Sequence, residues 1–254
     1  MIYFFTATGN DKYVAERIAE SSGDATKSMT ECTWESDYEC DLQKGENLGI
    51  VVPTYFWGLP SVVSDFLSKL RVSGKPAYTF IVATYGTTCG AVGRYAEKLL
   101  AENGISTDAL FSVKMPDTWT VMFDLSDKAA VAEKNAAADV QIAKVARSVA
   151  ERLHSKRMPG SVPAFLAWFA QRLYQGARKT NHLNAGGKCI GCGLCARQCP
   201  VRAITMEDKH PKWVKERCAM CLGCLHRCPV FAIQYSDKTE AHGQYTHPGV
   251  KLPT

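Results

Sequence analysis

Two cysteine runs with the same spacing lie in the last quarter of this 254-residue chain. They are Cys189-Ile-Gly-Cys-Gly-Leu-Cys-Ala-Arg-Gln-Cys-Pro200 and Cys218-Ala-Met-Cys-Leu-Gly-Cys-Leu-His-Arg-Cys-Pro229. Each reads C-x2-C-x2-C-x3-C-P, a spacing typical of chains that hold two iron–sulfur clusters, where the fourth cysteine of each run binds the other cluster. We therefore expect two [4Fe–4S] clusters, one held by Cys189, Cys192, Cys195 and Cys228, the other by Cys218, Cys221, Cys224 and Cys199.

Other uses of clustered cysteines fit the pattern less well. A zinc site needs four ligands with a longer spacer between two pairs, and it gives no reason for the third cysteine or the following proline. Disulfides are disfavoured because closely spaced thiols on tight loops face one way, and because no signal peptide opens the chain.

The two runs belong to a longer internal duplication. Cys199-Pro-Val-Arg-Ala-Ile204 aligns with Cys228-Pro-Val-Phe-Ala-Ile233, so one supersecondary unit occurs twice. On these residues, the stretch from about Asn184 to Tyr235 resembles the bacterial-type two-cluster ferredoxins. The resemblance implies a small α+β domain with a short strand pair in each half, which passes single electrons at low potential.

The overall composition is that of a globular protein, with 46% hydrophobic and 22% charged residues. No apolar run approaches the roughly 20 residues needed to span a bilayer, so we expect no transmembrane segment. Eight thiolates committed to oxygen-sensitive clusters, without a signal peptide, predict a cytoplasmic protein of an anaerobe.

The net charge of +5 is unevenly distributed. Basic and acidic residues number 20 each in residues 1–180, but 9 against 5 in residues 181–240. The excess forms either a basic rim that steers an acidic redox partner or a solvated surface that balances the clusters. Bound clusters would offset much of it, which argues against a nucleic-acid partner. The rim residues are Arg197, Arg202, Lys212, Lys215, Arg217 and Arg227.

The first part of the chain alternates apolar strands with amphipathic helices. Strands are predicted at residues 1–5, 48–53, 78–83 and 109–115, with a poorly patterned one near residues 25–29. A long helix from about Ser126 to His154 closes the set. The alternation predicts an α/β fold with a doubly wound parallel sheet, whose ligand sits outside the carboxyl ends of the strands.

Three loops at those carboxyl ends have content suited to one ligand. The loop Thr6-Ala-Thr-Gly-Asn-Asp11 aims hydroxyl and N–H groups at the start of a helix, which favours an anion. It matches neither the nucleoside-triphosphate loop nor the dinucleotide fingerprint. The other two loops add aromatic planes, so a flat ring with a phosphate tail, such as FMN, would satisfy all three. The predicted FMN-binding residues are Thr6, Thr8, Gly9, Asn10, Asp11, Pro53, Thr54, Tyr55, Phe56, Trp57, Gly58, Thr84, Tyr85 and Gly86.

At these loops the chain resembles the flavodoxins, over roughly residues 1–155. The phosphate loop of that family reads approximately [ST]-x-T-G-N-[ST], and its two later loops flank the flavin ring. The resemblance implies a flavodoxin-like sheet of order 2-1-3-4-5 with FMN where the strand order reverses. This chain departs from the family at Asp11, which places a carboxylate where phosphate charge is expected.

For several side chains the sequence allows both a functional and a purely structural role. Tyr55, Trp57 and Tyr85 either bind the ring or are ordinary wall residues of the sheet edge. Trp119 either reaches the flavin or covers the domain surface. Cys89 is either a reactive thiolate near a helix start or an inert small hydrophobe.

The chain divides into four predicted parts: a flavodoxin-like FMN-binding domain over residues 1–157, a linker over 158–181, a two-cluster ferredoxin domain over 182–240, and a loose C-terminal tail over 241–254. The linker contains a helical stripe flanked by arginine, formed by Phe165, Trp168, Phe169 and Leu173. Such a stripe either lies on a membrane surface or packs against its own protein. We predict packing, with the helix as a brace between the domains.

The whole chain resembles the flavodoxin-fused ferredoxins of anaerobic bacteria and archaea, which implies electron transfer. We expect a relay of low-potential electrons between redox partner proteins, because a flavin holds two electrons and each cluster holds one. One alternative is a flavin-dependent reductase whose clusters feed FMN for a small substrate, although no acid–base pair stands out near the loops. Another alternative is that the first domain holds no flavin and only docks a partner protein. The carboxylate of Asp11 in the phosphate loop is consistent with this alternative. The oligomeric state, a homodimer included, is left open by the sequence.

Overall fold

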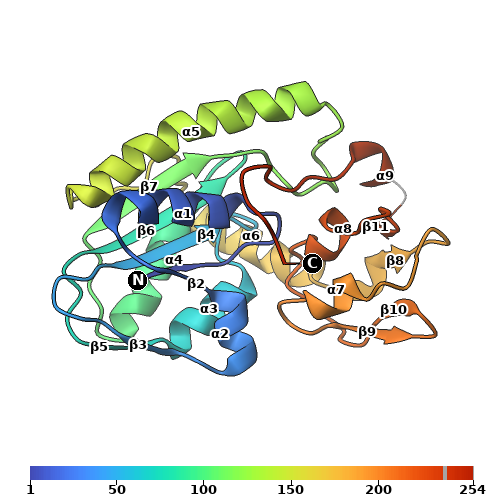
Figure 1. Ribbon diagram of the computed structural model, residues 1–254, viewed down its shortest axis with the longest axis horizontal. Coiled ribbons are helices and arrows are strands. Elements are labelled where there is room, and N and C mark those ends of the chain that lie inside the picture. The colour runs from blue at the N-terminus through green and yellow to red at the C-terminus, as the bar shows by residue number, and fades with distance from the viewer. Residues whose placement is uncertain (237–238, 254) are drawn as a thin grey trace.

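The computed structural model describes residues 1–236 and 239–253. Asp237, Lys238 and Thr254, which fall in the predicted ferredoxin domain and tail, lie outside these ranges. Figure 1 shows a sheet-and-helix domain beside a smaller cysteine-rich module, with the C-terminal segment running back toward the first domain. None of the helices in the described ranges combines the length and apolar character needed to cross a membrane.

The central sheet has five parallel strands in the order β2-β1-β4-β6-β7. Counted among themselves these strands run 2-1-3-4-5, so the predicted fold class is confirmed. The poorly patterned second strand lies within the predicted stretch, with Thr26 and Gly49 on either side of Ile2. The strand bounds are β1 (Ile2–Phe4), β2 (Thr26–Ser28), β4 (Leu48–Pro53), β6 (Thr79–Tyr85) and β7 (Ala109–Lys114). A separate parallel pair, not predicted, is formed by β3 (Glu39–Asp41) and β5 (Arg71–Ser73).

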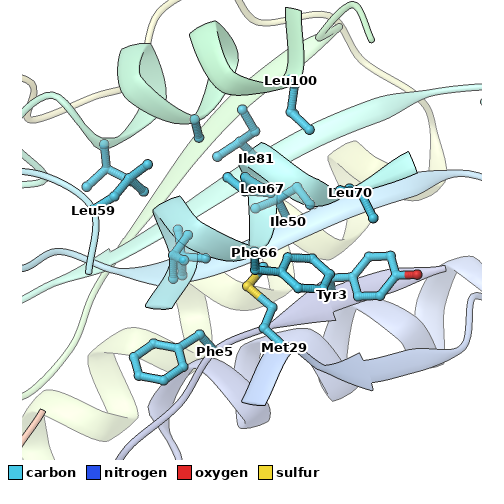
Figure 2. Packing of buried hydrophobic residues seen from close by; sticks show 14 of the residues in the cluster. Tyr3, Phe5, Met29, Ile50, Leu59, Phe66, Leu67, Leu70, Ile81 and Leu100 are labelled. Atoms are coloured by element: carbon cyan, nitrogen blue, oxygen red, sulfur yellow. The ribbon is translucent and has the colours of Figure 1, made fainter. Parts of the chain in front are cut away.

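Helices cover both faces of the sheet (Figure 1). On one face lie α1 (Asn10–Ser22) and the long α5 (Lys128–Ala150), and on the other lie α2 (Met29–Glu35), α3 (Ser61–Lys69) and α4 (Val92–Glu102). Figure 2 shows part of the second interface, where the rings of Tyr3 and Phe66 lie 5.1 Å apart beside Met29. Because side chains on both faces are buried, the central strands are apolar almost throughout.

The cysteine-rich module repeats one unit twice. Its antiparallel strand pairs are β8 (Leu183–Ala185) with β11 (Ile233–Tyr235), and β9 (Ile204–Glu207) with β10 (His210–Trp213). The short helices α7 (Leu194–Arg197) and α8 (Gly223–His226) occupy matching places in the two cysteine runs. The Ala203 N–H donates to Cys199 Sγ at 3.1 Å, and the Ala232 N–H donates to Cys228 Sγ at 3.3 Å. The duplication seen in the sequence is therefore a duplication of structure.

The linker helix α6 (Ala164–Ala177) connects the two parts, followed by a short 3-10 turn, η1 (Thr180–His182). Its inward side carries Ala167 and Tyr174, and the Tyr174 hydroxyl donates to the carbonyl of Ala219 in the module at 2.7 Å. The prediction that its apolar stripe packs against the protein is wrong, because the stripe residues are 55–70% exposed. Helical spacing gathers residues on one side of a helix, but it does not say which side meets solvent.

The C-terminal segment is packed, so the prediction of a loose tail is wrong. After α9 (Thr239–His242), the His247 N–H donates to the Thr8 carbonyl at 2.8 Å, and the Tyr245 hydroxyl donates to Asn10 Oδ1 at 2.8 Å. The amide of Gln244 donates to carbonyl oxygens of the module at 2.7 and 2.8 Å. We call residues 239–253 the C-terminal strap, because they contact both domains.

Candidate cofactor site

A cavity of about 560 Å³ opens at the carboxyl ends of β1, β4, β6 and β7. This volume is in the range of small-molecule sites. Its wall combines the three predicted loops with residues 115–123, with α6 and with the loop around Cys221. The predicted FMN-binding residues that line it are Thr8, Asn10, Asp11, Pro53, Thr54, Tyr55, Phe56, Trp57, Thr84, Tyr85 and Gly86.

The other three predicted residues shape the loops from behind. Thr6 Oγ1 accepts a hydrogen bond from the Gly9 N–H at 3.0 Å. Gly9 has a φ of 102°, and a Cβ there would lie 2.9 Å from Val250 in the C-terminal strap. At Gly58, a Cβ would lie 2.5 Å from Gln171 Nε2 in α6. Both glycines therefore permit close packing rather than direct contact with a ligand.

The loop before α1 offers hydrogen-bond donors for an anion. Within the described ranges, the N–H groups of Ala7, Thr8 and Asn10 have no acceptor in the protein. They surround the start of α1, where the helix dipole also favours negative charge. This arrangement fits the phosphate of a bound nucleotide.

Asp11, the residue that departs from the flavodoxin pattern, is 3% exposed. Its Oδ1 accepts a hydrogen bond from Thr84 Oγ1 at 2.7 Å. Burial raises the pKa of this carboxyl to about 7, although hydrogen bonds from Thr84, from its own N–H and from Thr6 act in the lowering direction. The raised pKa lowers the negative charge that this carboxyl carries near neutral pH, which reduces the conflict with a phosphate.

The aromatic loop forms a tight turn. Tyr55 and Gly58 exchange two backbone hydrogen bonds of 2.9 Å, and φ is 46° at Phe56 and 60° at Trp57. Positive φ at both central residues is typical of a type I′ turn, but it is strained for bulky residues and needs support from the surroundings. Two neighbours supply that support.

One neighbour is Gly90, where a Cβ would lie 2.2 Å from the Trp57 carbonyl oxygen. The other is Gln171 in α6, whose amide donates to the carbonyls of Tyr55 at 2.7 Å and Phe56 at 3.0 Å. The linker helix thus positions the aromatic turn.

We expect Gln171→Leu to destabilise the fold by about 1–3 kcal/mol, because the Phe56 carbonyl loses its donor and the Tyr55 carbonyl keeps only the Gly58 N–H. Chemical denaturation measures the change. Gln175→Leu on the same helix is the matched control, since its side chain is exposed and makes one exposed contact with Arg178. A Gln171→Leu variant as stable as this control would show that the turn holds itself.

Two polar atoms in the cavity wall are buried and unpaired within the described chain, namely Thr54 Oγ1 and Trp119 Nε1. Trp119 packs on Phe56 with ring centroids 4.8 Å apart, so it belongs to the cavity rather than to a remote surface. Unpaired polar atoms between aromatic rings fit a flat ligand with polar edges. Together with the anion loop, these residues fit a flavin nucleotide.

Of the two interpretations of Cys89, the structure favours an inert, buried thiol. It is fully buried, its Sγ donates to the Pro159 carbonyl at 3.0 Å, and burial raises its pKa to about 11. A thiol with this pKa is protonated near neutral pH and is a poor nucleophile.

The cysteines of the two runs gather in two groups. Burial raises the pKa of Cys195, and the nearby Cys192, Cys228 and Cys189 raise it further. Burial likewise raises the pKa of Cys224, with further contributions from Cys221, Cys218, Cys199 and Cys195. Cys228 therefore lies near cysteines of the first run and Cys199 near those of the second, while Cys195 lies near both groups. Among the described residues, no three His, Cys, Asp or Glu side chains are placed to hold a single metal ion.

The two groups differ in their surroundings. We call Cys189, Cys192, Cys195 and Cys228 the outer group, because Cys192 is exposed to solvent. We call Cys199, Cys218, Cys221 and Cys224 the inner group, because Cys221 lines the cavity. The inner loop also meets the anion loop, since a Cβ at Gly223 would lie 3.6 Å from the Ala7 carbonyl oxygen.

Several residues of the predicted basic rim are held by contacts within the chain. Lys212 pairs with Glu207 at 2.8 Å, Lys215 donates to the Val201 carbonyl at 2.6 Å, and Arg227 donates to the Pro253 carbonyl at 2.6 Å. Arg197 donates to the carbonyl of Cys192 at 2.8 Å, beside the outer group. Arg202 stands over the Trp34 ring, and Arg217 lies near Glu216.

The fold and the cavity define a flavodoxin-like domain joined to an iron–sulfur module, and comparison with known proteins agrees. Residues 1–139 match the flavodoxin domain family and residues 183–229 match the 4Fe-4S dicluster domain. The chain belongs to the flavodoxin domain family and also carries a dicluster domain, as in a flavodoxin-fused ferredoxin. The two matches together indicate an electron-transfer protein with iron–sulfur clusters and a flavin.

Individual relatives cover parts of the chain. NADH-quinone oxidoreductase subunit 9 of Rhodothermus marinus is 42% identical over 50 residues, which are 20% of this chain and 22% of that protein. The chain thus spans less than a quarter of the length of this relative. A solved flavodoxin of Streptococcus pneumonia TIGR4 is 17% identical, with a TM-score of 0.32 over 57% of this chain and 97% of that one.

Proposed function

We propose that this protein relays low-potential electrons between partner proteins through two [4Fe–4S] clusters and FMN. The main support for the proposal is that one cysteine group lies toward the solvent and the other lies toward the cavity. The outer group reaches solvent at Cys192, and the inner group reaches the cavity at Cys221. The outer group would hold a cluster within reach of a partner protein, and the inner group would hold one within reach of a flavin in the cavity.

In this proposal the cysteines of the outer and inner groups ligate the first and second cluster, respectively. The N–H groups of Ala7, Thr8 and Asn10 would hold the phosphate, and Tyr55, Trp57, Tyr85 and Trp119 would enclose the ring. Bound FMN would supply a store for two electrons, between one-electron steps at the clusters. Aromatic walls and α6 would limit the water around a bound ring, because the cavity lining is mostly apolar.

The proposal retains the division of the chain at residues 157, 181 and 240, and a reducing compartment such as the cytoplasm. Partners would dock at the outer group, and Arg197 beside Cys192 favours an acidic docking face.

The ratio of flavin to iron tests the proposal. Protein purified anaerobically is expected to release about one FMN for about eight irons, identified by chromatography after acid extraction. Eight irons without flavin, even after soaking in FMN, would leave a ferredoxin with a docking domain.

A second candidate is a flavin-dependent reductase that acts on its own small substrate. It is favoured by the extent of the cavity, which continues past the three loops to Leu166, Phe169 and Leu173 of α6. Asp117 also lines the cavity, and burial raises its pKa. Oxidation of the reduced protein by a small molecule, without a partner protein, distinguishes this enzyme from the relay.

A further inference from the structure

The linker helix α6 turns its apolar side to solvent. Phe165 is 70% exposed, Trp168 57%, Phe169 59% and Leu173 55%. The inward positions instead carry the small Ala167, the amide of Gln171 and the hydroxyl of Tyr174, all of which contact the rest of the chain. A contiguous exposed surface of this kind marks an interaction site, because single exposed apolar residues are usually scattered.

The stretch of sequence that contains this helix carries only basic charges. Residues 152–206 contain no Asp or Glu and nine Lys or Arg residues, and α6 lies in the middle of this stretch. Arg157, Arg172 and Lys179 are exposed around the helix, and the Arg172 guanidinium stands over the Trp168 ring at 5.1 Å. The neighbouring loop of residues 115–125 adds Asp117, in the cavity wall, and Asp124. An apolar face with a basic border is complementary to a negatively charged surface that also accepts apolar side chains.

We propose that α6 docks the protein on the surface of a bilayer that contains anionic lipid. Phe165, Trp168, Phe169 and Leu173 enter the boundary between headgroups and acyl chains, and the basic residues meet the lipid phosphates. Bulky Phe, Trp and Leu side chains flanked by arginine and lysine are the pattern of helices that lie in the plane of a membrane interface. This docking does not depend on the proposed electron relay. It goes beyond the relay by placing the protein at a membrane surface.

Docking would also orient the cavity. Leu166, Phe169 and Leu173 both line the cavity and belong to the exposed side of α6, and Met122, 65% exposed, lines it as well. The edge of the cavity therefore lies on the face that meets the bilayer. Apolar molecules dissolved in the membrane would reach it without passing through water.

Vesicle co-sedimentation of the full protein, loaded with its cofactors under anaerobic conditions, tests the inference. Phosphatidylcholine vesicles are compared with vesicles that also contain phosphatidylglycerol, at low and high salt. We expect binding to the anionic vesicles to be at least about tenfold stronger, and to weaken with salt because surface charge is screened. The double variant Phe165→Ser with Trp168→Ser is expected to bind at least about tenfold more weakly, since two aromatic side chains no longer enter the lipid.

Val140→Ser is the matched control, because Val140 is 59% exposed on α5, away from this face. All variants should keep the flavin-to-iron ratio of the wild type, which shows that they fold. Absence of vesicle binding, or equal binding by the double variant, would overturn the inference. A wild-type dimer that the double variant converts to a monomer, without vesicle binding, would overturn it in favour of a second copy as the partner.

Discussion

Replacing Cys192 and Cys221 together with serine is expected to abolish reduction of the flavin by a low-potential electron donor. One substitution removes a predicted ligand from the outer group and the other removes a predicted ligand from the inner group. Because a [4Fe–4S] cluster uses four thiolates, each single variant should lose about four of about eight irons, and the double variant nearly all of them. Iron analysis and the rate of flavin bleaching after addition of the donor measure the two effects.

The single variants separate the roles of the two groups. Cys192→Ser should impair electron entry while the inner cluster remains, and Cys221→Ser should leave an outer cluster that is reduced without passing electrons on. Cys89→Ser is the control, because Cys89 is a buried cysteine outside both groups and serine can keep the hydrogen bond to Pro159. Flavin reduction at the wild-type rate in the double variant would contradict the relay.

FMN affinity is expected to fall as the pH rises through about 7, because Asp11 loses its proton beside the phosphate. The pKa of Asp11 is raised to about 7 by burial, so the carboxyl is neutral below this pH and negative above it. The groups that set this pKa in the described chain are Thr84, Thr6 and its own N–H, with no cation among them. If binding requires the protonated form, affinity drops about tenfold for each pH unit above 7.

Quenching of flavin fluorescence during titration of the flavin-free protein measures this dependence. Asp11→Asn should bind FMN tightly at both pH 6 and pH 8, because the amide has the same shape and no charge to lose. Riboflavin, which lacks the phosphate, should show little pH dependence with the wild-type protein. The same pH dependence in the Asp11→Asn variant would assign it to another group.

Much of the fold could be predicted because local patterns determine it. The alternation of buried runs and amphipathic helices predicted a parallel sheet, and the resemblance to the flavodoxins implied its five-stranded order, including a second strand that is only three residues long at Thr26–Ser28. The cysteine spacing predicted which cysteines gather together, because the crossed arrangement follows from the motif itself. Eleven of the predicted FMN-binding residues line one cavity, since carboxyl ends of parallel strands meet at one edge.

The remaining features depend on contacts that leave no periodic pattern. The C-terminal strap is held by single side chains such as Gln244 and by backbone carbonyls, so its sequence has the low apolar content of a loose tail. The apolar stripe on α6 could be recognised from its spacing in the sequence. Its orientation depends on Gln171 and Tyr174, whose hydrogen-bond partners lie more than forty residues away in the sequence. The polar groups of Gln171 and Tyr174 are the sequence signal for the inward side of the helix. That signal could be interpreted only once their hydrogen-bond partners were known.

The C-terminal strap has a consequence for how electrons would travel within the chain. Many redox modules are tethered by a free linker and must diffuse to their target, so that each turnover includes a search. Here the strap contacts Thr8 and Asn10 in the first domain, its Gln244 donates to carbonyls of the module, and α6 makes a second connection through Tyr174. In the proposed relay the two domains are already in contact, so the internal step needs no encounter and should be as fast in a viscous solution as in a dilute one.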